Sequence, residues 1–160
     1  MAQLIDRHSG SVWLEKGLVL TPGLTPDELI QFVGARPTGS FGKSCWYSDV
    51  RMETDSGNLI MALYFKGDGL KEFHASIHSG YGPSGALIKK KHDEMLIAML
   101  GRPMEEKPFT RSLFSKIVYK SAVQSWHNHA KELTWKSPWG VVKSTVDPRD
   151  GSAQIIVKWK

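Results

Sequence analysis

The stretch WGVVKSTVDPRDGSAQIIVKW, Trp139–Trp159, decides most of what the sequence says about the fold. Apolar runs around Val141 and over Ile155–Val157 flank a cluster of turn residues that includes Pro148 and Gly151. Proline presets the backbone angle of a turn and glycine adopts angles that other residues avoid, so the stretch predicts a β-hairpin. We expect the hairpin to complete a sheet, beside the first strand in one arrangement, and its main role to be structural.

Three strands are predicted upstream, over residues 43–55, 59–67 and 70–80. Gly57 and Gly69 separate them, each beside Asp or Asn, and supply the positive φ that tight hairpins need. Within the third strand apolar residues alternate with polar ones, which predicts one buried face and one solvent-exposed face, called the wet face below.

Other elements are predicted from local signals. Residues 11–20 favour a strand, and residues 25–34 and 86–101 favour helices. Thr25 and a glutamate three positions later form a capping box, a pattern typical of a helix start. Residues 112–133 fit either a helix or a strand.

The order of these elements indicates an α+β domain. Short turns make the sheet mostly antiparallel, with a meander over 43–79, the C-terminal hairpin 139–159, and two or three helices packed on one face. Segments 34–44 and 102–112 are predicted as loops. Residues 1–160 are about the size of one domain and are expected to form one.

Composition narrows the class of protein. No stretch reaches the roughly eighteen uninterrupted apolar residues of a membrane helix, and the N-terminus does not have the pattern of a secretion signal. Cys45 is the only cysteine, so the chain can form no internal disulfide. We expect Cys45 to be a buried structural thiol and the protein to be cytoplasmic, without a membrane segment.

The net charge of +5 is unevenly distributed. Residues 1–80 carry seven Lys/Arg and nine Asp/Glu, a net of −2, whereas residues 81–160 carry fourteen and seven, a net of +7. The basic half makes nucleic-acid binding the alternative function. Scattered lysines and scarce arginine favour an ordinary solvated surface instead, and this includes the run Lys89–His92 on the second predicted helix.

Motifs for catalysis or metal binding are weak. His127-Asn128-His129 spells the name of a nuclease family, but neighbouring residues point in different directions on a regular element, so the match is coincidental. Glu72, His74 and His78 share the wet face of the third predicted strand. The two histidines would lie about 13 Å apart along a strand, too far to share one ion. We therefore expect no metal and no cofactor.

Residues 59–160 contain a series of short motifs in a characteristic order. They are Phe65-Lys66-Gly67-Asp68-Gly69-Leu70-Lys71, His92-Asp93, Leu100-Gly101, Trp139-Gly140, Ser144, Asp147-Pro148-Arg149, Gly151-Ser152 and Ile155-Ile156-Val157. The pattern resembles that of small bacterial immunity proteins, which are encoded beside toxins in competition systems; residues 104–134 depart from it.

The resemblance implies a non-enzymatic protein that binds a cognate toxin and blocks it, with no catalytic residue. It transfers no contact residue, so the candidates come from the wet face of the predicted sheet: Glu53, Glu72, His74 and His78. Either the acidic N-terminal half faces a basic toxin or the lysine-rich half faces an acidic one. A homo-oligomer and an enzyme of another type stay open.

Overall fold

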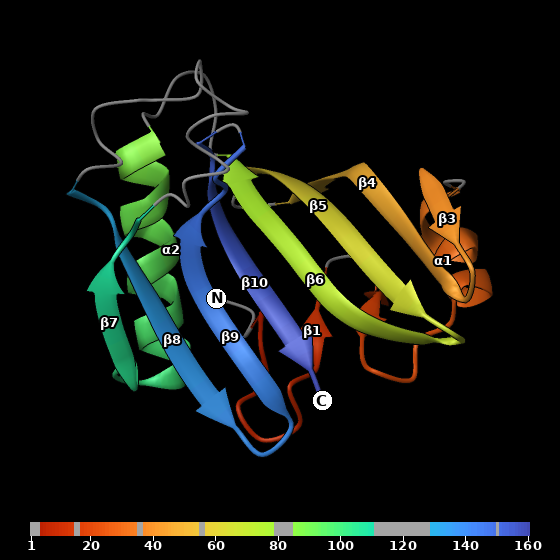
Figure 1. Ribbon diagram of the computed structural model, residues 1–160, viewed down its shortest axis with the longest axis horizontal. Coiled ribbons are helices and arrows are strands. Elements are labelled where there is room, and N and C mark those ends of the chain that lie inside the picture. Colours follow the sequence, from red (N-terminus) through yellow and green to blue (C-terminus); the bar gives the residue numbers. More distant parts are fainter. Residues whose placement is uncertain are drawn as a thin grey trace.

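The computed structural model describes residues 4–14, 17–34, 37–54, 57–78, 85–110, 129–149 and 151–160. Within this part of the chain the main feature is an eight-stranded antiparallel sheet with the strand order β3-β4-β5-β6-β10-β9-β8-β7 (Figure 1). The strands are β3 (Gly39–Phe41), β4 (Ser44–Thr54), β5 (Gly57–Lys66), β6 (Gly69–His78), β7 (Glu105–Pro108), β8 (Lys131–Ser137), β9 (Gly140–Val146) and β10 (Ala153–Trp159).

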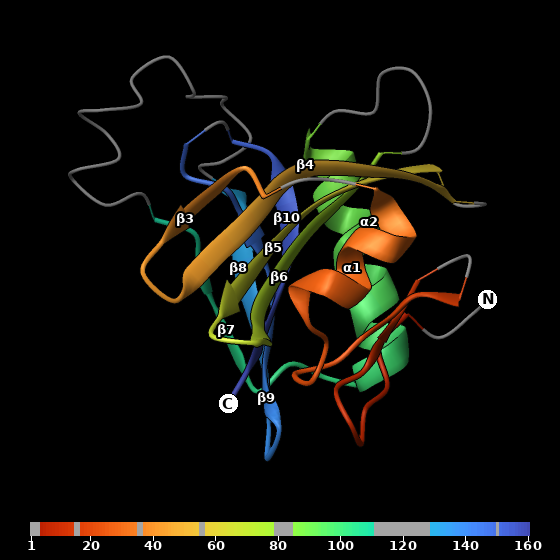
Figure 2. The same cartoon turned by 90° about the vertical axis from the view of Figure 1, so that its right-hand side faces the viewer.

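Two helices and a small hairpin cover one face of this sheet. The helices α1 (Pro26–Val33) and α2 (Gly85–Leu100) lie on the same side as β1 (Val12–Trp13) and β2 (Val19–Leu20), which pair with each other (Figure 2). The predicted α+β class and the placement of the helices on one face are confirmed. Of the two or three helices expected, the described residues contain two.

The C-terminal hairpin lies in the centre of the sheet. β10 pairs with β6, so Ile155 lies opposite Ala75, and its other edge pairs with β9. The predicted meander and hairpin are confirmed, but the placement beside a first strand is wrong. Within the predicted strand 11–20, the described residues form the two short strands β1 and β2, which pair with each other; Gly17, with a left-handed φ of 81°, lies between them.

Both edge strands of the sheet were predicted as loops. β3 lies inside segment 34–44 and β7 inside segment 102–112; among the described strands, β3 pairs with β4 alone and β7 with β8 alone. An edge strand bonds along one side and needs no buried apolar run, and all four residues of β7 are exposed. β8 starts at the end of the segment left open between helix and strand; residues 111–128 lie outside the described part.

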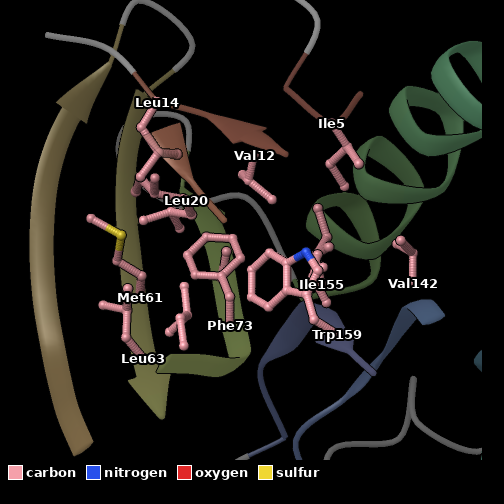
Figure 3. Packing of buried hydrophobic residues seen from close by; sticks show 14 of the residues in the cluster. Ile5, Val12, Leu14, Leu20, Met61, Leu63, Phe73, Val142, Ile155 and Trp159 are labelled. Carbon is pink, nitrogen blue, oxygen red and sulfur yellow. The ribbon is translucent and has the colours of Figure 1, made fainter. Parts of the chain in front are cut away.

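The core lies between the sheet and the elements on its covered face (Figure 3). Phe73 and Ile155 on the central strands and Met61 on β5 are buried there, as are Val12 and Leu20 from the N-terminal hairpin. Cys45 is only half-buried against this core, and burial raises the pKa of its thiol.

Helix α2 buries two polar residues that the sequence placed in solvent. Lys89 is 4% exposed and His92 is 1% exposed, so the predicted solvated run Lys89–His92 is wrong at these two positions. The Lys89 Nζ donates to Asp93 Oδ1 at 2.6 Å, and Ser144 Oγ on β9 donates to the same oxygen at 2.5 Å. Burial lowers the pKa of Lys89, and the Asp93 carboxylate offsets this only in part. Leu87 on the same helix is exposed.

Candidate functional site

The face of the sheet opposite the helices is called the open face here, because within the described residues no helix lies over it (Figure 2). Successive strand residues point to opposite faces, so the register assigns the side chains to it. It carries Trp46, Arg51, Glu53, Tyr64, Glu72, His74, Glu132, Lys136, Lys143, Thr145, Ile156 and Lys158.

An ion-paired group occupies the middle of the open face. His74 Nε2 donates to Glu72 Oε1 at 2.5 Å, and Lys158 Nζ lies 3.0 Å from the same oxygen. The strand register brings them together, because Lys158 on β10 lies directly opposite Glu72 on β6. A carboxylate can only accept, so the His74 proton is on Nε2. The other ring nitrogen, Nδ1, is buried and has no hydrogen-bond partner within the described part of the chain.

Tyr64 lies on the other side of Glu72, directly opposite it on β5. The Tyr64 ring lies against the His74 imidazole, with centroids 5.0 Å apart and planes tilted by 54°. Burial alone would raise the pKa of Glu72, but the hydrogen bonds from His74 and Lys158 outweigh it and lower that pKa below its ordinary value. The carboxylate is therefore ionised and held in position at neutral pH.

The β9–β10 turn adds a second ion pair beside this group. Arg149 donates to both carboxylate oxygens of Asp147, with Nη2 at 2.6 Å from Oδ2 and Nε at 3.0 Å from Oδ1. The Arg149 backbone N–H also donates to Oδ1 at 2.8 Å, which closes the turn locally. Burial would raise the pKa of Asp147, yet these bonds from Arg149 lower it overall.

These two groups border one shallow hollow of about 470 Å³, which is open to solvent. Its walls come from Tyr64, Glu72, His74, Asp147, Arg149 and Lys158, and Ile156 supplies an apolar patch. The charged groups that border the hollow form ion pairs with one another. Such a surface presents fixed charges of both signs and suits the recognition of another surface.

The other two predicted residues lie away from the hollow. Glu53 is exposed on β4, opposite Asn58 on β5, which in turn lies opposite His78 on β6. This row lies about 20 Å along β6 from Glu72, since His78 is six residues further along that strand. The side chain of His78 is outside the described part. The structure thus brings Glu72 and His74 together and places Glu53 and His78 in a separate row.

Sequence reasoning missed a second network on the open face. Glu132 on β8 accepts from Lys143 Nζ at 3.0 Å and from Thr145 Oγ1 at 2.9 Å, and Lys107 Nζ lies 3.4 Å away. At the sheet edge Lys136 pairs with Glu105. Glu132, with Lys131 and Lys136 nearby in sequence, was the available signal, but only the pairing of β7, β8 and β9 shows which groups meet.

Among the described side chains, no three His, Cys, Asp or Glu residues gather closely enough to hold a metal ion. No helix of the described residues has the length and apolar character needed to cross a membrane.

Comparison with known proteins gives one structural likeness to report. No protein-family model and no curated protein matches the chain. A chain from the solved structure "Rhs1-CT in complex with cognate immunity protein RhsI1" is 13% identical, with a TM-score of 0.46, over 98% of this chain and 86% of that chain. The function proposed below rests on the open face and on the sequence motifs.

Proposed function

We propose that the protein is a non-enzymatic binding module of the cytoplasm, an immunity protein that binds and neutralises a cognate bacterial toxin through its open face. The observation that carries the proposal is the contrast between the two faces of the sheet. One face is filled by helices and core, and the other holds ion pairs around the hollow. The motifs over residues 59–160 support the toxin as the class of partner.

The pairing of charges favours a protein partner over nucleic acid. Lys158, Lys143, Lys107 and Lys136 each lie within ion-pair distance of a carboxylate on this face. Binding to a phosphate backbone depends on cations that can replace the counterions of the polymer. Lysines already neutralised by neighbouring carboxylates contribute less to that exchange, whereas alternating charges can match the mixed charges of a protein surface.

Aromatic side chains give the open face anchors of the kind that protein interfaces use. Trp46 lies directly opposite Tyr64, and both are half-buried, so each leaves part of its ring exposed. The Trp46 ring packs over Gly39, where an added Cβ would come within 2.3 Å of it. Rings held in this way lose little freedom on binding, which raises the affinity they can supply.

The test uses the toxin domain that this proposal predicts to be encoded beside the protein. Binding is measured by calorimetry and protection by growth of cells that express the toxin. We expect the double variant Glu72→Ala/His74→Ala to weaken binding by about 30-fold or more, as hot-spot truncation does. The matched control is Lys90→Ala/Glu94→Ala, which removes one base and one acid from an exposed ion pair of α2 and should leave affinity unchanged.

A second double variant, Glu53→Ala/His78→Ala, tests the row at the far end of the face. Unchanged affinity with all four residues replaced would exclude the open face. No binding and no protection by the wild-type protein would overturn the immunity function itself. A DNA or RNA complex that forms at low salt and weakens steeply with added salt would support the alternative function.

A further inference from the structure

A small cavity lies where three distant parts of the chain meet: the end of α2, the turn between β8 and β9, and the loop that contains Arg7. Its volume is about 140 Å³, and we call it the tryptophan pocket because Trp135 and Trp139 line it. It shares no residue with the hollow of the open face.

The pocket has an apolar floor and a basic rim. Leu100, Trp135 and Val142 line it and are buried, so they form the floor. Arg7 and Arg102 line it and are exposed, so they lie at the rim. An occupant that satisfies both parts must combine an apolar group with a negative charge.

Hydrogen bonds hold the two indole walls in place. Trp135 Nε1 donates to the Gly101 carbonyl at 2.9 Å, and Trp139 Nε1 donates to the Arg7 carbonyl at 3.0 Å. The Trp135 bond also covers a carbonyl just beyond the negative end of α2, which would otherwise repel an anion. The pocket therefore needs little rearrangement to receive a ligand.

The charge of the pocket has one sign. Its described lining includes Arg7, Arg102 and Lys136 and, within that part of the chain, contains no Asp or Glu. Lys136 pairs with Glu105 outside the pocket, whereas neither arginine takes part in an ion pair among the described residues. Arginine presents several donors in a fixed fork that matches a carboxylate, so these two groups can bind one directly.

We infer that the tryptophan pocket is a binding site for an acidic protein segment, in which an apolar side chain enters the cavity and flanking carboxylates meet Arg7 and Arg102. The volume decides the class of ligand. Small-molecule and cofactor sites usually measure about 300–1,000 Å³, so a cavity of this size suits a single side chain better than a nucleotide. This site goes beyond the proposed function and does not depend on the identity of the toxin.

The test follows the indole N–H signals of Trp135 and Trp139 in the ¹⁵N-labelled full-length protein by NMR. The probe is the peptide acetyl-Glu-Leu-Glu-amide, and acetyl-Gln-Leu-Gln-amide is its neutral counterpart. We expect the acidic peptide to shift both signals saturably, with a Kd on the order of 1 mM, and the neutral peptide to bind about tenfold more weakly. Added salt should weaken the binding of the acidic peptide and leave the binding of the neutral peptide unchanged.

Two variants test whether an arginine of the pocket rim binds the carboxylates of the peptide. Arg102→Gln should weaken binding of the acidic peptide about tenfold. Arg51 is an exposed arginine on β4 outside the pocket, so Arg51→Gln should leave the affinity for the peptide unchanged. Equal binding of both peptides, or no loss in Arg102→Gln, would overturn the inference. A decathymidylate oligonucleotide that shifts the same signals when the peptide does not would point to nucleic acid instead. None of these readouts involves the toxin, so the two proposals can fail separately.

Discussion

Replacing Gly10 with alanine should destabilise the protein through a contact that only glycine permits. Gly10 is buried, has a left-handed φ of 73°, and would place an added Cβ 2.3 Å from Cε3 and 2.4 Å from Cδ2 of Trp139. The indole cannot move away freely, because its N–H donates to the Arg7 carbonyl. The Gly10 carbonyl is also occupied, since it accepts from Trp159 Nε1 at 3.0 Å.

Two effects set the loss of stability expected for Gly10→Ala. A left-handed backbone costs a non-glycine residue about 1–2 kcal/mol, and overpacking of a buried site costs about 1–3 kcal/mol more. Gly17 is the matched control, because its φ is 81° and an added Cβ meets nothing within 4 Å. Gly17→Ala should therefore show only the backbone cost, and Gly10→Ala should be less stable than it by about 1–3 kcal/mol. For a chain of this length that difference is about 2–12 °C in Tm.

Urea denaturation followed by tryptophan fluorescence and circular dichroism measures both variants. The loss of unfolded-state entropy that accompanies any Gly→Ala change cancels between them. Binding of acetyl-Glu-Leu-Glu-amide gives an independent readout, since a displaced Trp139 should weaken it in Gly10→Ala alone. Equal destabilisation of the two variants would refute the contact between Gly10 and the indole.

Three other substitutions have defined outcomes. Tyr47→Phe should raise the free energy of unfolding by about 1 kcal/mol in urea denaturation, because the buried hydroxyl has no hydrogen-bond partner among the described residues; a loss of stability would contradict this. Trp135→Phe should lower it by about 1–3 kcal/mol in the same assay, since the Gly101 carbonyl loses its donor, and an unchanged value would speak against that bond. Burial would raise the pKa of Glu132, but hydrogen bonds from a lysine and a threonine of β9 lower it overall. The stability that Glu132 contributes is present above its ordinary pKa of 4.5 and is lost as the pH falls through the lowered value, so Glu132→Gln should flatten the fall in Tm below that pH.

Local signals in the sequence were sufficient to predict the features that depend only on residues close together in the chain. The capping box of α1 forms as predicted, with the Thr25 N–H donating to Glu28 Oε2 at 2.9 Å and the Glu28 N–H donating to Thr25 Oγ1 at 3.3 Å. Gly34 ends that helix in a left-handed conformation. Short turns likewise fixed the hairpins of the meander and of β9–β10. Each of these features depends on residues a few positions apart, which a single sequence contains.

Features that depend on distant partners could not be predicted. Alternation along β6 correctly assigned Glu72 and His74 to one wet face, but nothing near them indicates that Lys158 completes their ion pair. Lys89 was assigned to solvent because a lysine run is usually exposed. Its burial depends on Asp93 and on Ser144 from a strand far along the chain, and only the packing of α2 on β9 brings the three together.

The C-terminal strand couples the two proposed binding surfaces. Lys158 points to the open face and reaches Glu72. The next residue, Trp159, points to the covered face and donates to the carbonyl of Gly10, the residue beside the Trp139 indole. Adjacent residues of a strand face opposite sides, so one register sets both contacts and a slip by one residue would lose both. Shortening β10 should therefore abolish toxin binding and peptide binding together. Point substitutions, such as Glu72→Ala on one surface and Arg102→Gln on the other, should affect one kind of binding and leave the other unchanged.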